Sequence, residues 1–187
     1  MMKKLIQTCV VLVLFLNAAE VIAQKKNELS PVADSYVFIN KKNDNYGAEN
    51  KVLVRRLPGK IHNAFIKFDI SGAEAAVNKA VLRLYCTDIE DASISTSVDL
   101  FSTEDIDWTE AALNYTNAPK PSKKASNVVV DKKNAYHEWD VTNLVKQSKT
   151  AGSKYITFRL SDQKGTGNGI QFSSKEASSN KPQLVIE

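Results

Sequence analysis

Residues 80–85 of this 187-residue chain read Ala-Val-Leu-Arg-Leu-Tyr. Successive side chains of a β-strand point to opposite faces of the sheet. Leu82 and Leu84 would therefore share one face, and Arg83 and Tyr85 the other. An apolar face opposite a polar face is typical of an antiparallel strand that lies between the core and solvent. This stretch therefore predicts a strand with one buried side.

Similar runs of about 4–9 residues, bounded by Asn, Gly, Asp, Ser or Pro, follow one another along most of the chain. We expect strands at residues 35–39, 51–57, 63–70, 79–87, 96–101, 127–130, 136–141, 154–160, 169–173 and 183–186. Short helices are expected only after Asp107 and after Thr142, which are suited to be their N-caps. About ten short antiparallel strands predict an all-β fold, a β-sandwich of the jelly-roll type.

The N-terminus has the three-part pattern of a secretory signal peptide. Two lysines precede an apolar run at residues 5–16, and the small residues Val21 and Ala23 stand before a cleavage point. The run is too short to span a bilayer comfortably, although an uncleaved anchor is the alternative. We therefore expect a signal peptide at residues 1–23, a flexible polar tail at 24–30 and one domain at 31–187. The protein would be secreted, extracellular or in the cell envelope, with no membrane span.

Composition and charge exclude several classes of protein. A hydrophobic content of 43% excludes disorder and low-complexity scaffolds. Cys86 is the one cysteine left after the predicted cleavage, so an internal disulfide is excluded. Of 25 basic and 21 acidic residues, two lysines and one glutamate leave with the signal, and the net charge becomes +3. This charge is too small to indicate a nucleic-acid partner.

The outward positions of several predicted strands carry cations. If the alternation is read in each strand, the non-core face of the sandwich collects Arg55, Lys67, Arg83, Tyr85 and Lys175, with Arg159 as a further candidate. Arginine binds a carboxylate in a planar two-pronged geometry, and a tyrosine ring offers flat apolar surface to a sugar. These residues indicate a binding face for an acidic polysaccharide. The alternative is a solvated face on which the cations pair with neighbouring carboxylates.

Other motifs are less specific. Asp34, beside the first expected strand, is a candidate ligand for a structural calcium ion, and no cofactor is otherwise required. His62 and His137 have no second histidine or cysteine nearby, which argues against zinc. Tyr85 and His62 have the chemistry of a lyase base, but no spacing supports catalysis, and a structural or adhesive surface protein is a third alternative.

Several blocks of the sequence, in their order and spacing, resemble the DNRLRE domain, also classed as carbohydrate-binding module family 96. The blocks lie at residues 33–37, 45–47, 64–71, 80–85, 107–110, 114–119, 139–142, 172–176 and 182–185. The resemblance covers residues 31–187. It implies a jelly-roll sandwich that binds a polysaccharide, with alginate as the associated ligand. A separate polysaccharide-degrading enzyme is the partner that it suggests.

Overall fold

The computed structural model describes residues 26–74, 76–103 and 105–187. The predicted signal peptide at residues 1–23 lies outside these residues. Within the described part of the chain, no helix has both the length and the apolar character needed to cross a membrane.

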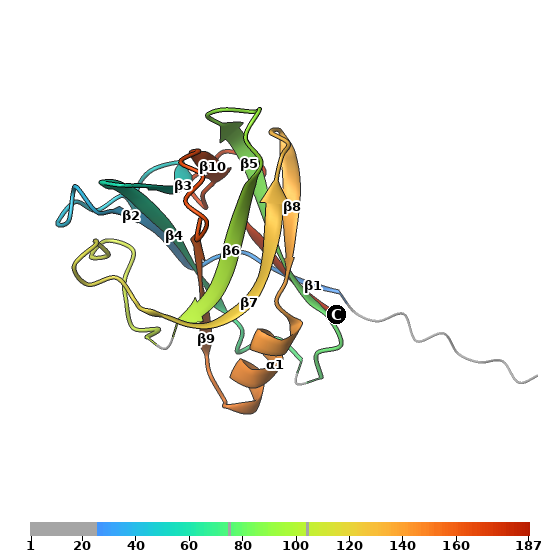
Figure 1. Cartoon of the computed structure of the whole chain (residues 1–187). Helices are drawn as coiled ribbons and strands as arrows, with labels where there is room; N and C mark the ends of the chain where they lie inside the picture. Colours follow the sequence, from blue (N-terminus) through green and yellow to red (C-terminus); the bar gives the residue numbers. More distant parts are fainter. Residues whose placement is uncertain (1–25, 75, 104) are drawn as a thin grey trace, which may run out of the picture.

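The described chain consists of β-strands and one helix. The elements are β1 (Asn27–Leu29), β2 (Ala33–Phe38), β3 (Lys51–Leu57), β4 (Lys60–Asp69), β5 (Ala80–Ile89), β6 (Thr96–Thr103), β7 (Pro121–Val130), β8 (Ala135–Asp140), α1 (Thr142–Thr150), β9 (Tyr155–Ser161), β10 (Ile170–Ser173) and β11 (Gln183–Ile186). Their central order is β1-β11-β5-β10-β3-β4-β9-β6-β7, with β2 added to β4 and β8 to β5. Figure 1 shows that the sheet is strongly curled and that α1 lies at one of its ends.

The predicted all-β class with antiparallel strands is confirmed, because each strand pair in the sheet is antiparallel. A jelly roll of two separate sheets stays a prediction. Strand β3 joins the two halves of the sheet, since residues 51–54 pair with β10 and residues 55–57 pair with β4. The pairing therefore continues through β3, and the curled sheet encloses its own core.

Strand β5 has the predicted register. Leu82 and Leu84 are fully buried in the main core, whereas Arg83 and Tyr85 are partly exposed on the other face of β5. Trp139 of β8 is also fully buried, and its indole nitrogen donates a hydrogen bond to the carbonyl oxygen of Val98 at 3.0 Å. This bond joins the two halves of the curled sheet across the core.

The outer face of β4 differs from the expectation. A second apolar cluster, made of Ala33, Val37, Phe65, Trp108 and Leu113, lies on the side of β2 and β4 that is turned away from the main core. The segment that follows β6 supplies two of these residues, and it lies beside β2 and β4 in Figure 1. Strand β4 is therefore covered on both faces.

Three local expectations are corrected. Residues 27–29, which were expected to be part of a flexible tail, form β1 and pair with β11. The helix after Thr142 is present, but Thr142 does not cap it. Its hydroxyl group instead accepts a hydrogen bond from the backbone nitrogen of Ala80 at 3.0 Å, so it ties the helix start to β5. The stretch after Asp107 forms a turn instead of a helix.

Candidate functional site

The outer face of β5 and β8 carries a compact group of aromatic and basic side chains. Tyr85 is paired with Tyr136 across the two strands, and their rings make an edge contact with centroids 5.2 Å apart. The guanidinium carbon of Arg83 lies 4.5 Å from the centroid of the Tyr136 ring. Arg83 also donates to Glu138 at 2.8 Å and to Gln183 at 2.6 Å. Its side chain is thus held in place while 28% of it stays exposed.

A groove of about 440 Å³ adjoins this group. Its floor comes from β3, β5 and β10, and its wall comes from residues 177–180, in the loop that precedes β11. The lining residues are Asn50, Lys51, Tyr85, Thr87, Gln171, Ser173, Ala177, Ser178, Ser179 and Asn180. The hydroxyl group of Tyr136 donates to the carbonyl oxygen of Lys181 at 3.3 Å and so links this loop to β8. We call the groove and the group around Arg83 the outer groove.

The outer groove has the size and chemistry for several units of an extended polar chain. It crosses β8, β5, β10 and β3, which corresponds to three strand spacings or about 14 Å. Tyrosine rings supply flat apolar surface, and amide and hydroxyl groups supply hydrogen bonds in both directions. Lys51 supplies a cation at the far end. Among the described residues, no acidic group lies within ion-pair distance of it.

A larger depression of about 630 Å³ lies at the start of α1. It is lined by Asn78, Lys79, Ala125, Ser126, Asp140, Val141, Thr142, Asn143 and Leu144. The lining contains no aromatic ring, and Asp140 already accepts a hydrogen bond from the backbone of Thr142. Asp140 is therefore engaged in the helix start, and the depression offers little for sugar recognition.

The structure separates the five residues that we expected on one face. Arg83 and Tyr85 belong to the outer groove. Arg55 is paired with His62 of β4 in the sheet, and its guanidinium group forms an ion pair with Glu90. The expectation of one continuous row of cations is therefore wrong.

Lys67 gives the clearest correction, because only 7% of it is exposed. Its ammonium group donates to the carbonyl oxygens of Ile106 and Trp108 and lies 4.7 Å from the Trp108 ring. Burial lowers the pKa of Lys67. This lysine anchors the segment after β6 to β4, and a ligand on the surface does not reach it.

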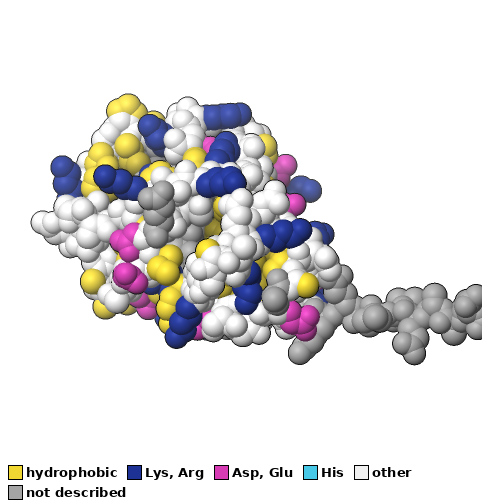
Figure 2. All heavy atoms as spheres, turned by 90° about the horizontal axis from the view of Figure 1, so that it is seen from below, with side chains coloured by type: hydrophobic (Ala, Val, Ile, Leu, Met, Phe, Trp, Pro, Cys, Tyr) yellow, Lys and Arg dark blue, Asp and Glu magenta, His cyan; other side chains and the backbone are white. Residues whose placement is uncertain are grey.

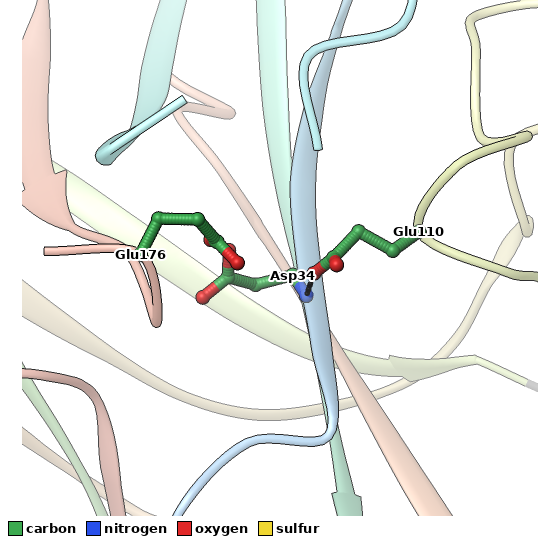
Figure 3. Close-up of side chains that lie close together, drawn as sticks. All are labelled: Asp34, Glu110 and Glu176. Carbon is green, nitrogen blue, oxygen red and sulfur yellow. Dashed lines mark hydrogen bonds between the residues drawn. The ribbon is translucent and has the colours of Figure 1, made fainter. Parts of the chain in front are cut away.

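Lys175 lies in a cluster of carboxylates formed by Asp34, Glu110 and Glu176 (Figure 3). Its ammonium group contacts Glu176 at 2.5 Å and Glu110 at 3.0 Å. Hydrogen bonding to Glu176, with a contribution from Glu110, raises the pKa of Lys175. Burial raises the pKa of the Asp34 carboxyl group to about 8. The cluster is a candidate metal centre.

Charge alone does not mark a binding patch on the face shown in Figure 2. Lys and Arg side chains are spread over that face, with Asp and Glu side chains between them. The arrangement of the tyrosine rings and Arg83 in the outer groove is therefore more informative than the number of basic residues.

Sequence reasoning missed Tyr136, Lys51 and Gln171. The signal for Tyr136 was present, because in β8 it alternates with the buried His137 and Trp139. No local pattern indicates that residues 177–180 form a wall beside β5, since these segments are about ninety residues apart in sequence.

The sequence is similar to proteins of known classes. The profile of carbohydrate-binding module family 96 matches residues 25–187. A gellan lyase from Bacillus sp. is 22% identical over 166 residues. That alignment covers 86% of this chain and 7% of the lyase, so the chain spans only a small part of its relative.

Proposed function

Since the chain belongs to carbohydrate-binding module family 96, we propose that it binds an acidic polysaccharide in the outer groove. The observation that carries the proposal is the contact between Arg83 and Tyr136, with Tyr85 beside them and the groove next to Tyr85. A sugar ring would lie against Tyr85 or Tyr136, while its carboxylate accepts hydrogen bonds from the exposed part of Arg83.

The proposal replaces the row of cations by two separated basic groups, Arg83 and Lys51. Arg83 is held by Glu138 and Gln183, so little side-chain freedom is lost when it binds a ligand. Lys51 lies two strands from Tyr85 and would meet a carboxylate further along the same polysaccharide chain. Three other basic residues contact groups within the protein, and the proposal gives them no direct contact with the ligand: Arg55, Lys67 and Lys175.

Alginate and gellan are the ligands to compare. Alginate is the ligand that the family resemblance implies, and gellan is named by the relative. Both are acidic polysaccharides, and both suit a groove with separated cations. The protein would act outside the cytoplasm, after removal of residues 1–23, beside a separate enzyme that degrades the polysaccharide.

Affinity electrophoresis of residues 24–187 in gels with alginate, gellan, pectin or a neutral glucan tests the proposal. We expect retardation by an acidic polysaccharide that weakens between 0.1 and 1 M salt, because the Debye length falls from about 10 Å to about 3 Å. Arg83→Ala should lower the affinity by about tenfold or more, since a charge-assisted hydrogen bond contributes about 1.5–3 kcal/mol.

Arg56→Ala is the matched control, because Arg56 is an exposed arginine of β3 outside the outer groove. Arg83→Lys should recover only part of the affinity, since the two-pronged contact is lost while the charge remains. Equal retardation by neutral and acidic polysaccharides would contradict the proposal. So would equal effects of Arg83→Ala and Arg56→Ala.

Catalysis is the second candidate because one relative is a lyase. That activity belongs to a protein of which this chain covers 7%. We expect no rise in the ultraviolet absorbance of unsaturated uronates when the chain is incubated with alginate or gellan. A sustained rise that Tyr85→Phe abolishes would favour a lyase instead.

A further inference from the structure

Three carboxylates from distant parts of the sequence converge beside β2 (Figure 3). Asp34 comes from β2, Glu110 from the segment after β6, and Glu176 from the loop after β10. One oxygen from each lies within 4.8 Å of the other two. Asp34 is only 1% exposed, so the centre of the cluster is buried. The cluster therefore differs from a group of solvated acids on the surface.

Part of the cluster is already satisfied by hydrogen bonds. Asp34 Oδ2 accepts from the backbone nitrogen of Lys175 at 2.7 Å, and Glu110 Oε1 accepts from the backbone nitrogen of Asp34 at 2.8 Å. The ammonium group of Lys175 donates to Glu176 Oε1 at 2.5 Å and lies 3.0 Å from Glu110 Oε2. These bonds fix the three side chains so that they point toward one another.

Two oxygens remain without a partner. Asp34 Oδ1 and Glu176 Oε2 are buried and accept no hydrogen bond from the described residues. A buried carboxylate oxygen without a partner destabilises a fold by a large amount. Both oxygens belong to carboxylates of the same cluster (Figure 3). The observation points to a positively charged partner at this place.

The charge balance and the type of donor define that partner. Three ionised carboxylates carry three negative charges, and Lys175 offsets one of them, so a divalent cation would neutralise the cluster. All three side chains offer oxygen, which suits hard cations and not zinc or copper. Calcium accepts irregular arrangements of 6–8 oxygens, whereas magnesium demands nearly ideal octahedral geometry.

The surroundings hold Glu110 in position before any ion binds. The side-chain nitrogen of Asn45 donates to the carbonyl oxygens of Glu110 and Leu113, at 2.6 and 2.8 Å. Gly47 lies directly against Glu110, because a Cβ atom built there would be 2.5 Å from Glu110 Cγ. The turn at residues 45–47 thus serves as a support for one ligand.

We propose that Asp34, Glu110 and Glu176 form a calcium-binding site, with Asp34 Oδ1 and Glu176 Oε2 as ligands, an oxygen of Glu110 as the third, and water completing the coordination. The ion joins β2, the segment after β6 and the loop after β10. Residues 177–180 of that loop form the wall of the outer groove, so the ion would also hold the groove in shape, a consequence that rests on the proposed function.

Isothermal titration of the EDTA-treated chain with calcium chloride, in the absence of any polysaccharide, tests the site directly. We expect one calcium ion per chain, much weaker binding of magnesium, and a higher unfolding temperature in calcium than in EDTA. Because no polysaccharide is present, this result is independent of the outer groove.

Glu176→Gln and Asp34→Asn should each lower the calcium affinity at least tenfold. Asp44→Asn, a change at an exposed carboxylate in the neighbouring turn, is the matched control and should leave the affinity unchanged. Lys175→Met removes a cation that competes with calcium for Glu110 and Glu176, so it should raise the calcium affinity. If Lys175 had only a structural role, its replacement would not raise this affinity.

Absence of calcium binding at millimolar concentration would overturn the proposal. Unchanged calcium affinity in Glu176→Gln would also overturn it, since the ion would then lie elsewhere. A third result would also contradict the site: no calcium binding, together with a higher unfolding temperature of Asp34→Asn. It would show that Asp34 and Glu176 share a proton in place of an ion.

Discussion

Replacement of Lys67 by alanine tests the assignment of this residue to the interior. The change removes an ammonium group that donates two hydrogen bonds, to the carbonyl oxygens of Ile106 and Trp108. A hydrogen bond that involves a charged group contributes about 1.5–3 kcal/mol. Burial of the ammonium group opposes this gain, as its lowered pKa indicates. We therefore expect the free energy of unfolding to fall by about 2–4 kcal/mol.

Urea denaturation followed by tryptophan fluorescence measures this loss, because Trp108 and Trp139 are the two tryptophans of the chain. A loss of about 3 kcal/mol corresponds to about 6–12 °C in the unfolding temperature of a domain of this size. Lys67→Met is the matched variant, since it keeps the apolar stem and removes only the charged donor. Arg83→Ala, on the exposed face of β5, should lose at most about 1 kcal/mol. If Lys67→Ala is no more destabilising than Arg83→Ala, the burial of Lys67 is refuted.

Three further predictions concern the core, pH and a close contact. Leu84→Ala should lower the free energy of unfolding by about 2–5 kcal/mol in urea titrations, because Leu84 is fully buried and its removal leaves a cavity. Burial holds the pKa of His62 at about 4, below its ordinary value of 6.5, so the unfolded chain takes up the proton first. The stabilisation by neutral His62 is therefore present above pH 6.5 and lost as the pH falls toward 4; His62→Phe should show a smaller loss of stability than the wild type over this interval. Gly47→Ala should lower both the unfolding temperature and the calcium affinity, because its Cβ atom would lie 2.5 Å from Glu110 Cγ; unchanged values would contradict that contact.

The comparison of β5 with β4 shows how far a local pattern predicts a fold. In β5 one face meets the core and the other meets solvent, so alternation in the sequence places Leu84 and Arg83 correctly. In β4 the same rule fails for Phe65 and Lys67, because a segment that follows about forty residues later covers the outer face. The apolar run of Ala64, Phe65 and Ile66 was a sign of burial on both faces.

The candidate sites were predictable in part for the same reason. Arg83 and Tyr85 are two residues apart, and the strand period places them on one face of the outer groove. Asp34 was a calcium candidate from its place beside a strand, but Glu110 is 76 residues away and its approach depends on the whole topology. Only the folded chain shows which carboxylates meet and which of their oxygens stay unpaired.

The pairing of β1 with β11 has a consequence for how this domain can be carried by a larger protein. Asn27 lies opposite Ile186, so the chain enters and leaves the sheet at one corner, about one strand spacing apart (Figure 1). Flanking segments could therefore run from the same point without stretching across the domain. The domain could be inserted into a loop of another protein if the two ends of that loop lie about 5 Å apart. Such a graft would leave the outer groove, which is lined by residues of β3, β5 and β10, open to solvent.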